Sequence, residues 1–348
     1  MKNRRFFVLV FLLFLVPSFT VSSQSPPNLK LQLRHLKKSL VNLKDLRSLS
    51  VTHSQWEEGH HKLLQSLQTQ SLSWCLIDFL SMAELVEIED DLLKLDLKST
   101  RENAACKKNI DARLENYWEL QRSQFLSFNT ITNIAIPSQV KKLDVSSGPI
   151  LVRGDLKDGE VALTFDDGPH PHESLKILEI LSSRGVLATY FALGQNAKRF
   201  PQITQTITGH GHTVASHSET HPSLPKMNFE NAKLEIQDGV RSVAEVIGVR
   251  VPFFRFPYGA ISPELKNYVK DTPLASFLWN MDSEDWKYKD LGQLWQNIIS
   301  ELDREKGGII LFHDIHRQTR EILPLFLEEL HRRKMNTIYF QAMPFSDD

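Results

Sequence analysis

The chain has 348 residues, of which 41% are hydrophobic and 24% are charged, so it has the composition of a globular protein and the length for two domains. This composition gives no indication of a disordered chain. The formal net charge of -1 shows no excess of basic residues, and we therefore expect no nucleic-acid partner.

The first residues have the pattern of an export signal. A basic start precedes an apolar core at residues 6–16, and residues 21–23 offer small side chains for cleavage. The apolar core is shorter than the roughly 20 residues of a spanning helix, and Pro17 interrupts it. We therefore predict a signal peptide at residues 1–23, no transmembrane span in the mature chain, and an exported protein that is periplasmic or secreted.

A helical repeat of apolar residues predicts a small all-α domain of about three helices at residues 24–128. In two places a serine precedes a glutamate by three residues, as in the capping box that starts a helix: Ser54 with Glu57, and Ser99 with Glu102. The apolar positions that recur three or four residues apart include Leu33, Leu36, Leu40, Leu43, Ile110, Leu114 and Tyr117.

Four aromatic residues are expected to form the core of this helical domain, and stacking on carbohydrate is the less favoured interpretation. They are Trp56, Trp74, Trp118 and Phe125. The sequence assigns the domain no role. We consider oligomerisation, docking to a cell wall or a partner, and covering a cleft.

Cys75 and Cys106 are the two cysteines of the chain, and an oxidising compartment would allow them to bond. A helix break at Ser99 would leave them offset by roughly 25 Å, too far for a disulfide, whereas a break near residues 89–91 would align them. Two unpaired buried cysteines are an equal alternative.

The pattern changes after the helical domain. Residues 129–158 contain prolines, glycines and charged residues, with a weak strand candidate at 134–136, and are expected to connect two domains. In residues 159–345, strand-like runs alternate with helical stretches, which predicts an α/β fold with seven parallel strands in a closed or nearly closed barrel. The runs are 161–165, 187–192, 213–216, 253–256, 275–279, 309–312 and 337–340.

Five polar motifs lie at the ends of these runs or just beyond them. In (β/α) barrels the loops at the carboxyl ends of the strands meet at one face, so we expect the motifs to share one site. The motifs span residues 164–169, 217–222, 255–258, 282–286 and 311–313.

Asp167, His217 and His221 are predicted to bind a divalent metal ion. One carboxylate and two imidazoles leave other positions on the metal open for water and substrate, and two histidines four residues apart can be aimed at one ion by a turn or a tight loop. A structural role is the alternative for a histidine pair alone, and the nearby aspartate pair argues against it. We expect zinc, with cobalt, nickel or iron as alternatives, because the same donors hold several metals.

Acid and base candidates lie in the same motifs. Side chains of neighbouring residues on a strand point apart, so Asp166 and Asp167 can face one cleft only across a turn, where one binds metal and the other acts as base; a simple Asx turn is the structural alternative. Arg255 is expected to hold Asp166 ionised. His313 ends an apolar run, and Asp285 is available to raise its pKa so that the imidazole donates a proton.

Together the five motifs resemble those of the polysaccharide deacetylases of carbohydrate esterase family 4, in the family's order, over about residues 157–342. The resemblance implies a distorted barrel of about seven strands, a divalent metal, and hydrolysis of acetyl groups on sugars. It also implies that Asp166 is the catalytic base and Asp285 tunes His313 as the general acid.

Further roles are implied by the same resemblance. Arg255 would orient Asp166, and the backbone amide of Tyr258 would stabilise the oxyanion. Pro257, Trp286 and Leu311 would shape the cleft around the acetyl group of the substrate.

The expected function is therefore metal-dependent removal of acetyl groups from N-acetylated sugars of a polysaccharide. Export favours peptidoglycan as the substrate, and chitin fragments or an exopolysaccharide are alternatives. Two other functions compete: an esterase that removes O-acetyl groups, and a noncatalytic protein that binds the cell wall. The full set of acid, base and metal residues argues against the noncatalytic protein.

Overall fold

The computed structural model describes residues 33, 36, 37, 40, 74–78, 80–92, 101–126, 132 and 134–343, without the side chains of residues 90, 91, 101–103 and 126. The predictions for the signal segment at 1–23, for the two capping boxes, and for Leu43 and Trp56 lie outside these residues.

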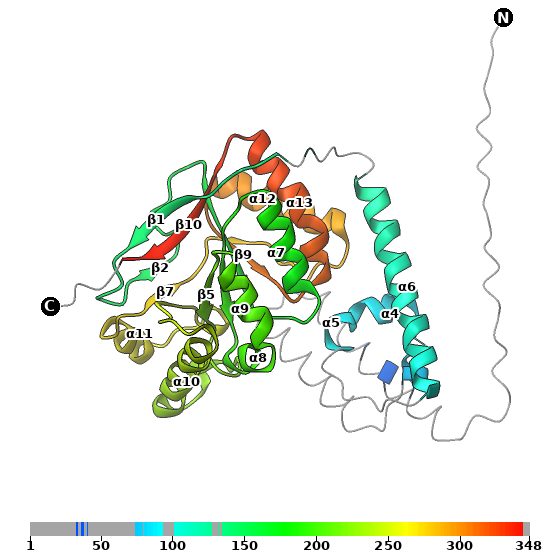
Figure 1. The fold of residues 1–348 in the computed structure, drawn as a ribbon, viewed down its shortest axis with the longest axis horizontal. Helices are drawn as coiled ribbons and strands as arrows, with labels where there is room; N and C mark the ends of the chain where they lie inside the picture. Colours follow the sequence, from blue (N-terminus) through cyan, green and yellow to red (C-terminus); the bar gives the residue numbers. More distant parts are fainter. Residues whose placement is uncertain are drawn as a thin grey trace, which may run out of the picture.

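A parallel sheet forms the body of the molecule, with helices around it (Figure 1). Strands β3 to β7 pair with one another in chain order. β9 pairs with the side of β3 that faces away from β4, and β8 pairs with β9. Strands β3 to β9 thus form a distorted barrel, in which the described residues show no pairing between β7 and β8. The strands are β3 (Glu160–Asp166), β4 (Thr189–Ala192), β5 (Thr213–Ser216), β6 (Phe253–Phe254), β7 (Ala275–Phe277), β8 (Met281–Asp282) and β9 (Gly308–His313). The α/β barrel predicted from the sequence is confirmed.

Three further strands extend the barrel. β10 (Asn336–Ala342) pairs with the first two residues of β3 and with β1 (Gln139–Leu143), and β2 (Ile150–Leu151) pairs with β7. Two strands therefore arise within the segment that the sequence predicts as a connection. The strand candidate at 134–136 was wrong: these residues form no strand, and the Ile136 amide instead donates to the carbonyl of Arg184 at 2.8 Å.

Helices cover the outside of the barrel because each buries one apolar stripe. In α12, for example, the buried residues Leu291, Leu294, Ile298 and Leu302 recur three or four apart. The barrel helices are α7 (Glu173–Ser183), α8 (Gly194–Arg199), α9 (Pro201–Gly209), α10 (Phe229–Ile247), α11 (Pro263–Lys270), α12 (Leu291–Glu305) and α13 (Arg317–Arg332), with short 3-10 turns η1 (Leu224–Lys226) and η2 (Pro257–Gly259).

The register between β3 and β9 sets the position of the site. Asp166 is paired with His313, and each is the last residue of its strand. His217 follows β5 directly, and Arg255 follows β6 directly. Four of the predicted motifs therefore meet at the carboxyl edge of the barrel, where parallel strands place their loops together.

The N-terminal helices lie beside the barrel, with α6 on the side that carries α13 (Figure 1). They are α3 (Trp74–Ile77), α4 (Met82–Glu87), α5 (Glu89–Leu92) and the long α6 (Arg101–Leu126). Trp118 is fully buried as predicted, Trp74 is half-buried, and Phe125 stacks edge-on against Trp295 of α12 at 6.3 Å between ring centroids. A capping box that the sequence reading missed starts α4, where Ser81 and Glu84 bond reciprocally.

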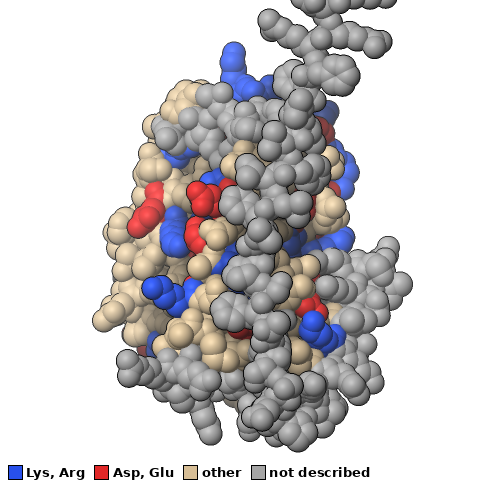
Figure 2. Space-filling model, turned by 90° about the vertical axis from the view of Figure 1, so that its right-hand side faces the viewer, with Lys and Arg blue, Asp and Glu red and all other residues tan. Residues whose placement is uncertain are grey.

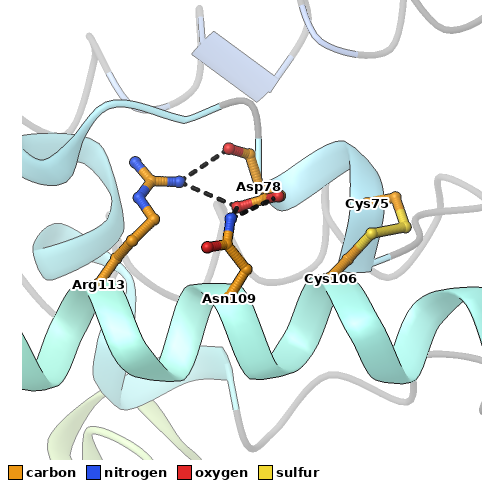
Figure 3. Close-up of a disulfide and its surroundings, with 5 residues drawn as sticks. All are labelled: Cys75, Asp78, Cys106, Asn109 and Arg113. Atoms are coloured by element: carbon orange, nitrogen blue, oxygen red, sulfur yellow. Dashed lines mark hydrogen bonds and ion pairs between the residues drawn. A yellow bond between two sulfur atoms is a disulfide. The ribbon is translucent and has the colours of Figure 1, made fainter. Parts of the chain in front are cut away.

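A disulfide joins Cys75 of α3 to Cys106 of α6, with 5.0 Å between their Cα atoms (Figure 3). Asn109 and Arg113, on the following turns of α6, both donate to the carboxylate of Asp78 just beyond α3. The long helix assumed for the 25 Å offset does not form, because the described residues 74–92 are divided among three short helices. Cys75 can therefore lie directly against α6.

Among the described residues, no helix combines the length and the apolar character needed to cross a membrane. The division of the chain into domains at 24–128, 129–158 and 159–345 stays a prediction.

Candidate active site

The aspartate pair turns sharply at the end of β3, so that both carboxylates reach one place. Asp166 closes the strand, and Asp167 takes a left-handed backbone with φ of 73°. This conformation is uncommon for residues other than glycine and costs free energy, and such strain is frequent at functional sites. Both side chains are buried, with 2% and 7% exposed, so the turn provides what two neighbouring acids need to share a cleft.

Asp167, His217 and His221 converge on one point. Oδ1 of Asp167 lies 3.6 Å from Nε2 of His217 and 3.3 Å from Nε2 of His221, and the two imidazole nitrogens are 3.2 Å apart. These three atoms form a group that could hold a metal ion. One carboxylate oxygen and two imidazole nitrogens are donors that zinc and neighbouring transition metals accept, so the residues fit a divalent cation.

The outer nitrogens of both imidazoles have partners that aim the inner nitrogens at this point. Nδ1 of His217 donates to the carbonyl oxygen of Arg255 at 2.8 Å, and Nδ1 of His221 lies 3.1 Å from the hydroxyl of Tyr258. Such contacts favour the tautomer in which Nε2 keeps its lone pair for a metal. Burial, together with the nearby His221, lowers the pKa of His217 well below its usual value, so this imidazole is neutral, as a ligand must be.

Asp166 is held by Arg255. Nη1 of Arg255 donates to Oδ1 of Asp166 at 2.7 Å and to the hydroxyl of Thr164 at 2.9 Å, while the guanidinium lies 4.2 Å from the ring centroid of Phe191. Burial raises the pKa of Asp166 to about 6, although Arg255 and His313 act to lower it. A carboxylate with this pKa can accept a proton near neutral pH.

His313 and Asp285 form a buried pair. His313 donates from Nδ1 to Oδ1 of Asp285 at 2.6 Å and from its backbone amide to Oδ2 at 2.8 Å. Burial alone would lower the pKa of His313, but the charge and hydrogen bond of Asp285 raise it to about 10. Burial would in turn raise the pKa of Asp285, and His313 brings it below the usual range. The pair therefore carries an imidazolium next to a carboxylate.

The acid and base candidates both border the metal-binding group. Nε2 of His313 is 4.0 Å from Oδ2 of Asp167, and Oδ2 of Asp166 is 3.6 Å from Nε2 of His217. A reacting carbonyl near the three ligand atoms would thus lie within reach of one group that accepts protons and one that donates them.

The remaining predicted residues lie at the same edge. Tyr258, in η2, has a left-handed backbone with φ of 60°, and its ring centroid is 4.5 Å from that of His221. Pro257 precedes it and is buried, while Trp286 and Leu311 are buried beside Asp285 and within β9. Their contacts with substrate, and the role of the Tyr258 amide, stay predictions.

Two residues that support Asp285 were missed from the sequence. Gln318 donates from Nε2 to the carbonyl of Asp285 at 2.5 Å, and the hydroxyl of Thr319 donates to its carboxylate. Both lie in the first turn of α13. A pair of polar residues at the start of an amphipathic helix, soon after His313, was the available signal.

A third acid, Asp314, was also missed. It is buried behind the aspartate turn, where its carboxylate accepts from the hydroxyl of Ser174, and a Cβ added to Gly168 would lie only 2.2 Å from one of its oxygens. Burial, with the charge of Asp167, raises the pKa of Asp314 to about 7, although the bond from Ser174 opposes the shift. A larger residue at 168 would therefore push the carboxylate of Asp314 away from its present position.

Comparison with known proteins gives the same family as the motifs. The family model described as Polysaccharide deacetylase matches residues 153–277. The peptidoglycan-N-acetylglucosamine deacetylase of Listeria monocytogenes is 32% identical over 195 residues, which are 56% of this chain and 39% of that protein. The chitooligosaccharide deacetylase of Azorhizobium caulinodans is 34% identical over 157 residues, which are 44% of this chain and 73% of that protein. The chain thus spans well under half the length of the Listeria relative.

A solved structure extends the likeness beyond the barrel. The peptidoglycan deacetylase of Bdellovibrio bacteriovorus has a TM-score of 0.67 and 26% sequence identity, and the match covers 92% of this chain and 97% of that one. The barrel fold, the order of the motifs and the relatives all indicate the same family. The chain belongs to the polysaccharide deacetylase family.

Proposed function

We propose that this chain is a metal-dependent hydrolase that removes acetyl groups from N-acetylated sugars of a polysaccharide. The observation that supports the proposal is the placement of Asp166 and His313 around the convergent atoms of Asp167, His217 and His221. A buried base, a buried protonated acid and a metal-binding group at one edge are what amide hydrolysis needs.

The chemistry divides among these side chains. A divalent cation held by Asp167, His217 and His221 would polarise the acetyl carbonyl and make a water easier to ionise. Asp166, fixed by its bond from Arg255, takes the proton of the attacking water.

Two further groups act on the carbonyl oxygen and on the leaving nitrogen. The backbone amide of Tyr258 donates to the oxygen that becomes negative as the carbonyl is attacked. His313 then gives its proton to the sugar nitrogen as the carbon–nitrogen bond breaks, and Asp285 stabilises the imidazolium until that transfer. The products are acetate and a free amine on the sugar.

We propose zinc as the cation. Two imidazoles and one carboxylate with open positions are a donor set that zinc uses in catalytic sites, and cobalt, nickel and iron accept the same donors. Elemental analysis of protein purified without added metal tests this, and an abundant metal other than zinc would contradict it.

We propose peptidoglycan as the substrate. The names of the Listeria and Bdellovibrio proteins support this choice, and the name of the Azorhizobium relative makes chitin oligomers the second candidate. We also propose that the chain is exported to the periplasm or secreted. The signal pattern at 1–23 supports export, as does the bond between Cys75 and Cys106, because disulfides persist in oxidising compartments.

Acetate release tests the proposal directly. The chain from residue 24 would be assayed on peptidoglycan, on chitin oligomers and on O-acetylated xylan, before and after treatment with a chelator and then with zinc. We expect release from peptidoglycan that the chelator abolishes and zinc restores. Release from xylan alone would identify an O-acetyl esterase, and no release from any substrate by the zinc-loaded protein would contradict a catalytic function.

A further inference from the structure

The first turn of α13 has two faces with different partners. On one face, Gln318 and Thr319 hold Asp285, which holds His313. On the other face, Arg317 and Glu321 reach the N-terminal helices. The turn therefore lies between the general acid and the N-terminal helices α3 to α6, called the helical region below. The helical region has no role in the proposed chemistry.

Ion pairs join this turn to the helical region. Arg122 of α6 donates from Nε and Nη2 to the two carboxylate oxygens of Glu321, at 2.8 Å and 2.9 Å. Arg317 donates from Nη2 to Glu115 of α6 at 2.7 Å and from Nη1 to Glu89 of α5 at 3.4 Å. Arg317 and Glu321 are four residues apart on α13, so both contacts are made on the same side of one helical turn.

An aromatic side chain, Trp118 of α6, also lies in the contact between the helical region and α13. Trp118 donates from its indole nitrogen to Glu89 at 2.6 Å, and its ring lies 5.5 Å from the guanidinium carbon of Arg317. Figure 2 views the side of the molecule that carries α6 in Figure 1, and its basic and acidic side chains are intermixed there. The helical region thus meets the barrel through paired charges around a buried tryptophan.

Each of these pairs has one buried partner, on α13, while Arg122 and Glu115 on α6 are 39% and 60% exposed. The side chains of Glu321 and Arg317 are only 6% and 9% exposed, and charges removed from water cost free energy unless partners compensate them. Burial alone would raise the pKa of Glu321, but hydrogen bonds from Arg122 and Arg320 bring it below its usual value. Removing Arg122 takes two hydrogen bonds from this buried carboxylate and leaves it to Arg320 and Arg317 on its own helix, so we expect the first turn of α13 to lose its fixed position against α6.

The network also reaches the loop of the aspartate pair. Arg320 donates to Glu321 at 2.6 Å and lies 2.9 Å from Glu173, the first residue of α7. Because α7 follows the turn that carries Asp166 and Asp167, the loops of the acid and of the base are both linked to Glu321.

We propose that the N-terminal helical region positions the general acid of the barrel, and that Arg317 and Glu321 are the positioning residues that transmit its contact to Asp285 and His313. The inference rests on the proposed function, because it states what orients the acid of that reaction. Both residues are bonded to the N-terminal helices and neither is in the group of candidate metal ligands, so we expect loss of the contact to lower kcat and to leave KM and bound metal unchanged.

Five variants of the full chain test this inference, one of them a control. Arg122→Ala and Glu321→Gln each break the bidentate pair between these residues. The double variant removes the same single interaction. Arg122→Lys keeps the positive charge but cannot donate two parallel hydrogen bonds to the carboxylate. Arg333→Ala is the matched control, because Arg333 also pairs with acids, Glu329 and Asp303, but at the far end of α13.

Two measurements are made on each protein: kcat and KM for acetate release from a short N-acetylated oligomer, and the ring ¹⁵N signals of His313, assigned by their loss in His313→Ala. We expect kcat to fall on the order of 10-fold in Arg122→Ala and Glu321→Gln, with shifted His313 signals. The double variant should be no slower than the slower single variant, since the two changes remove one interaction. Arg122→Lys should recover part of kcat, and Arg333→Ala should match wild type.

Three outcomes would overturn the inference: wild-type kcat in both single variants, a fall in kcat with unmoved His313 signals, or an equal fall in Arg333→Ala. Absence of acetate release by the wild type would refute the proposed function instead, and the His313 signals alone would then decide whether the helical region positions this side chain.

Discussion

Asp285 accepts hydrogen bonds from both the ring and the backbone amide of His313, so one carboxylate fixes the direction of the imidazole and also its charge. The hydroxyl of Thr319 donates to the same carboxylate and restrains it in turn. Asp285 therefore sets both the orientation and the protonation of His313, the proposed general acid.

Asp285→Asn keeps the size of that side chain and removes its charge. Burial lowers the pKa of His313 and Asp285 raises it to about 10, so without the charge this pKa should fall. Because His313 must be protonated to donate, the alkaline limb of the pH profile of kcat should move to lower pH. Rates of acetate release across the pH range check this. An alkaline limb at the wild-type position would mean that another group donates the proton.

Asp166→Asn should lower kcat by a factor of about 10² to 10⁴, since the amide cannot take a proton from water. Bound metal should remain, because Asp166 is outside the convergent group of three ligand atoms. The control is Asp158→Asn, at a side chain that is 69% exposed and pairs with Arg153. Acetate release and metal content would be measured together, and wild-type turnover in Asp166→Asn would rule out its role as base.

His217→Ala should lose metal and activity together, because one of two imidazole donors is removed. His210→Ala is the matched control: His210 precedes the same strand, β5, at its other end and contacts the carbonyl of Thr206. Elemental analysis and acetate release should show the loss in His217→Ala only. Full metal content in His217→Ala would show that the cation is held elsewhere.

Cys75→Ser should destabilise the helical region by about 3 to 4 kcal/mol, the chain-entropy value for a loop of this length. Urea unfolding followed by tryptophan fluorescence measures the change. A thiol reductant should have the same effect on the wild type and none on the variant. A wild type whose unfolding is indifferent to the reductant would contradict a stabilising disulfide.

Strands that carry chemistry were predictable because each is an apolar run that ends at a polar motif. β3 has seven residues, all buried after the first, and β9 has six, all buried, so their apolar pattern is easily recognised. β8 has only two residues, too few for any periodicity. β1 reads Gln-Val-Lys-Lys-Leu, mostly exposed, and joins the sheet through its backbone bonds to β10.

Contacts between distant residues could not be predicted from local pattern. Arg122 and Glu321 are 199 residues apart, and nothing near either one in the sequence indicates the other. The predicted metal ligands Asp167, His217 and His221 were different, because carboxylate and imidazole at the ends of parallel strands are brought together by the fold itself. The sequence alone thus predicts which groups react, and the structure shows which side chains hold those groups in place.

The pairing of β1 with β10 has a consequence for how the chain is made. Gln139 is paired with Ile338, so the sheet cannot be completed until almost the whole polypeptide has been synthesised. Contacts this distant in sequence slow folding, since a long loop must close before they form. A chain that stops short of β10 leaves β1 and the first residues of β3 with open edges, and open edges favour aggregation. We therefore expect a chain that lacks β10 to aggregate more readily than the complete chain.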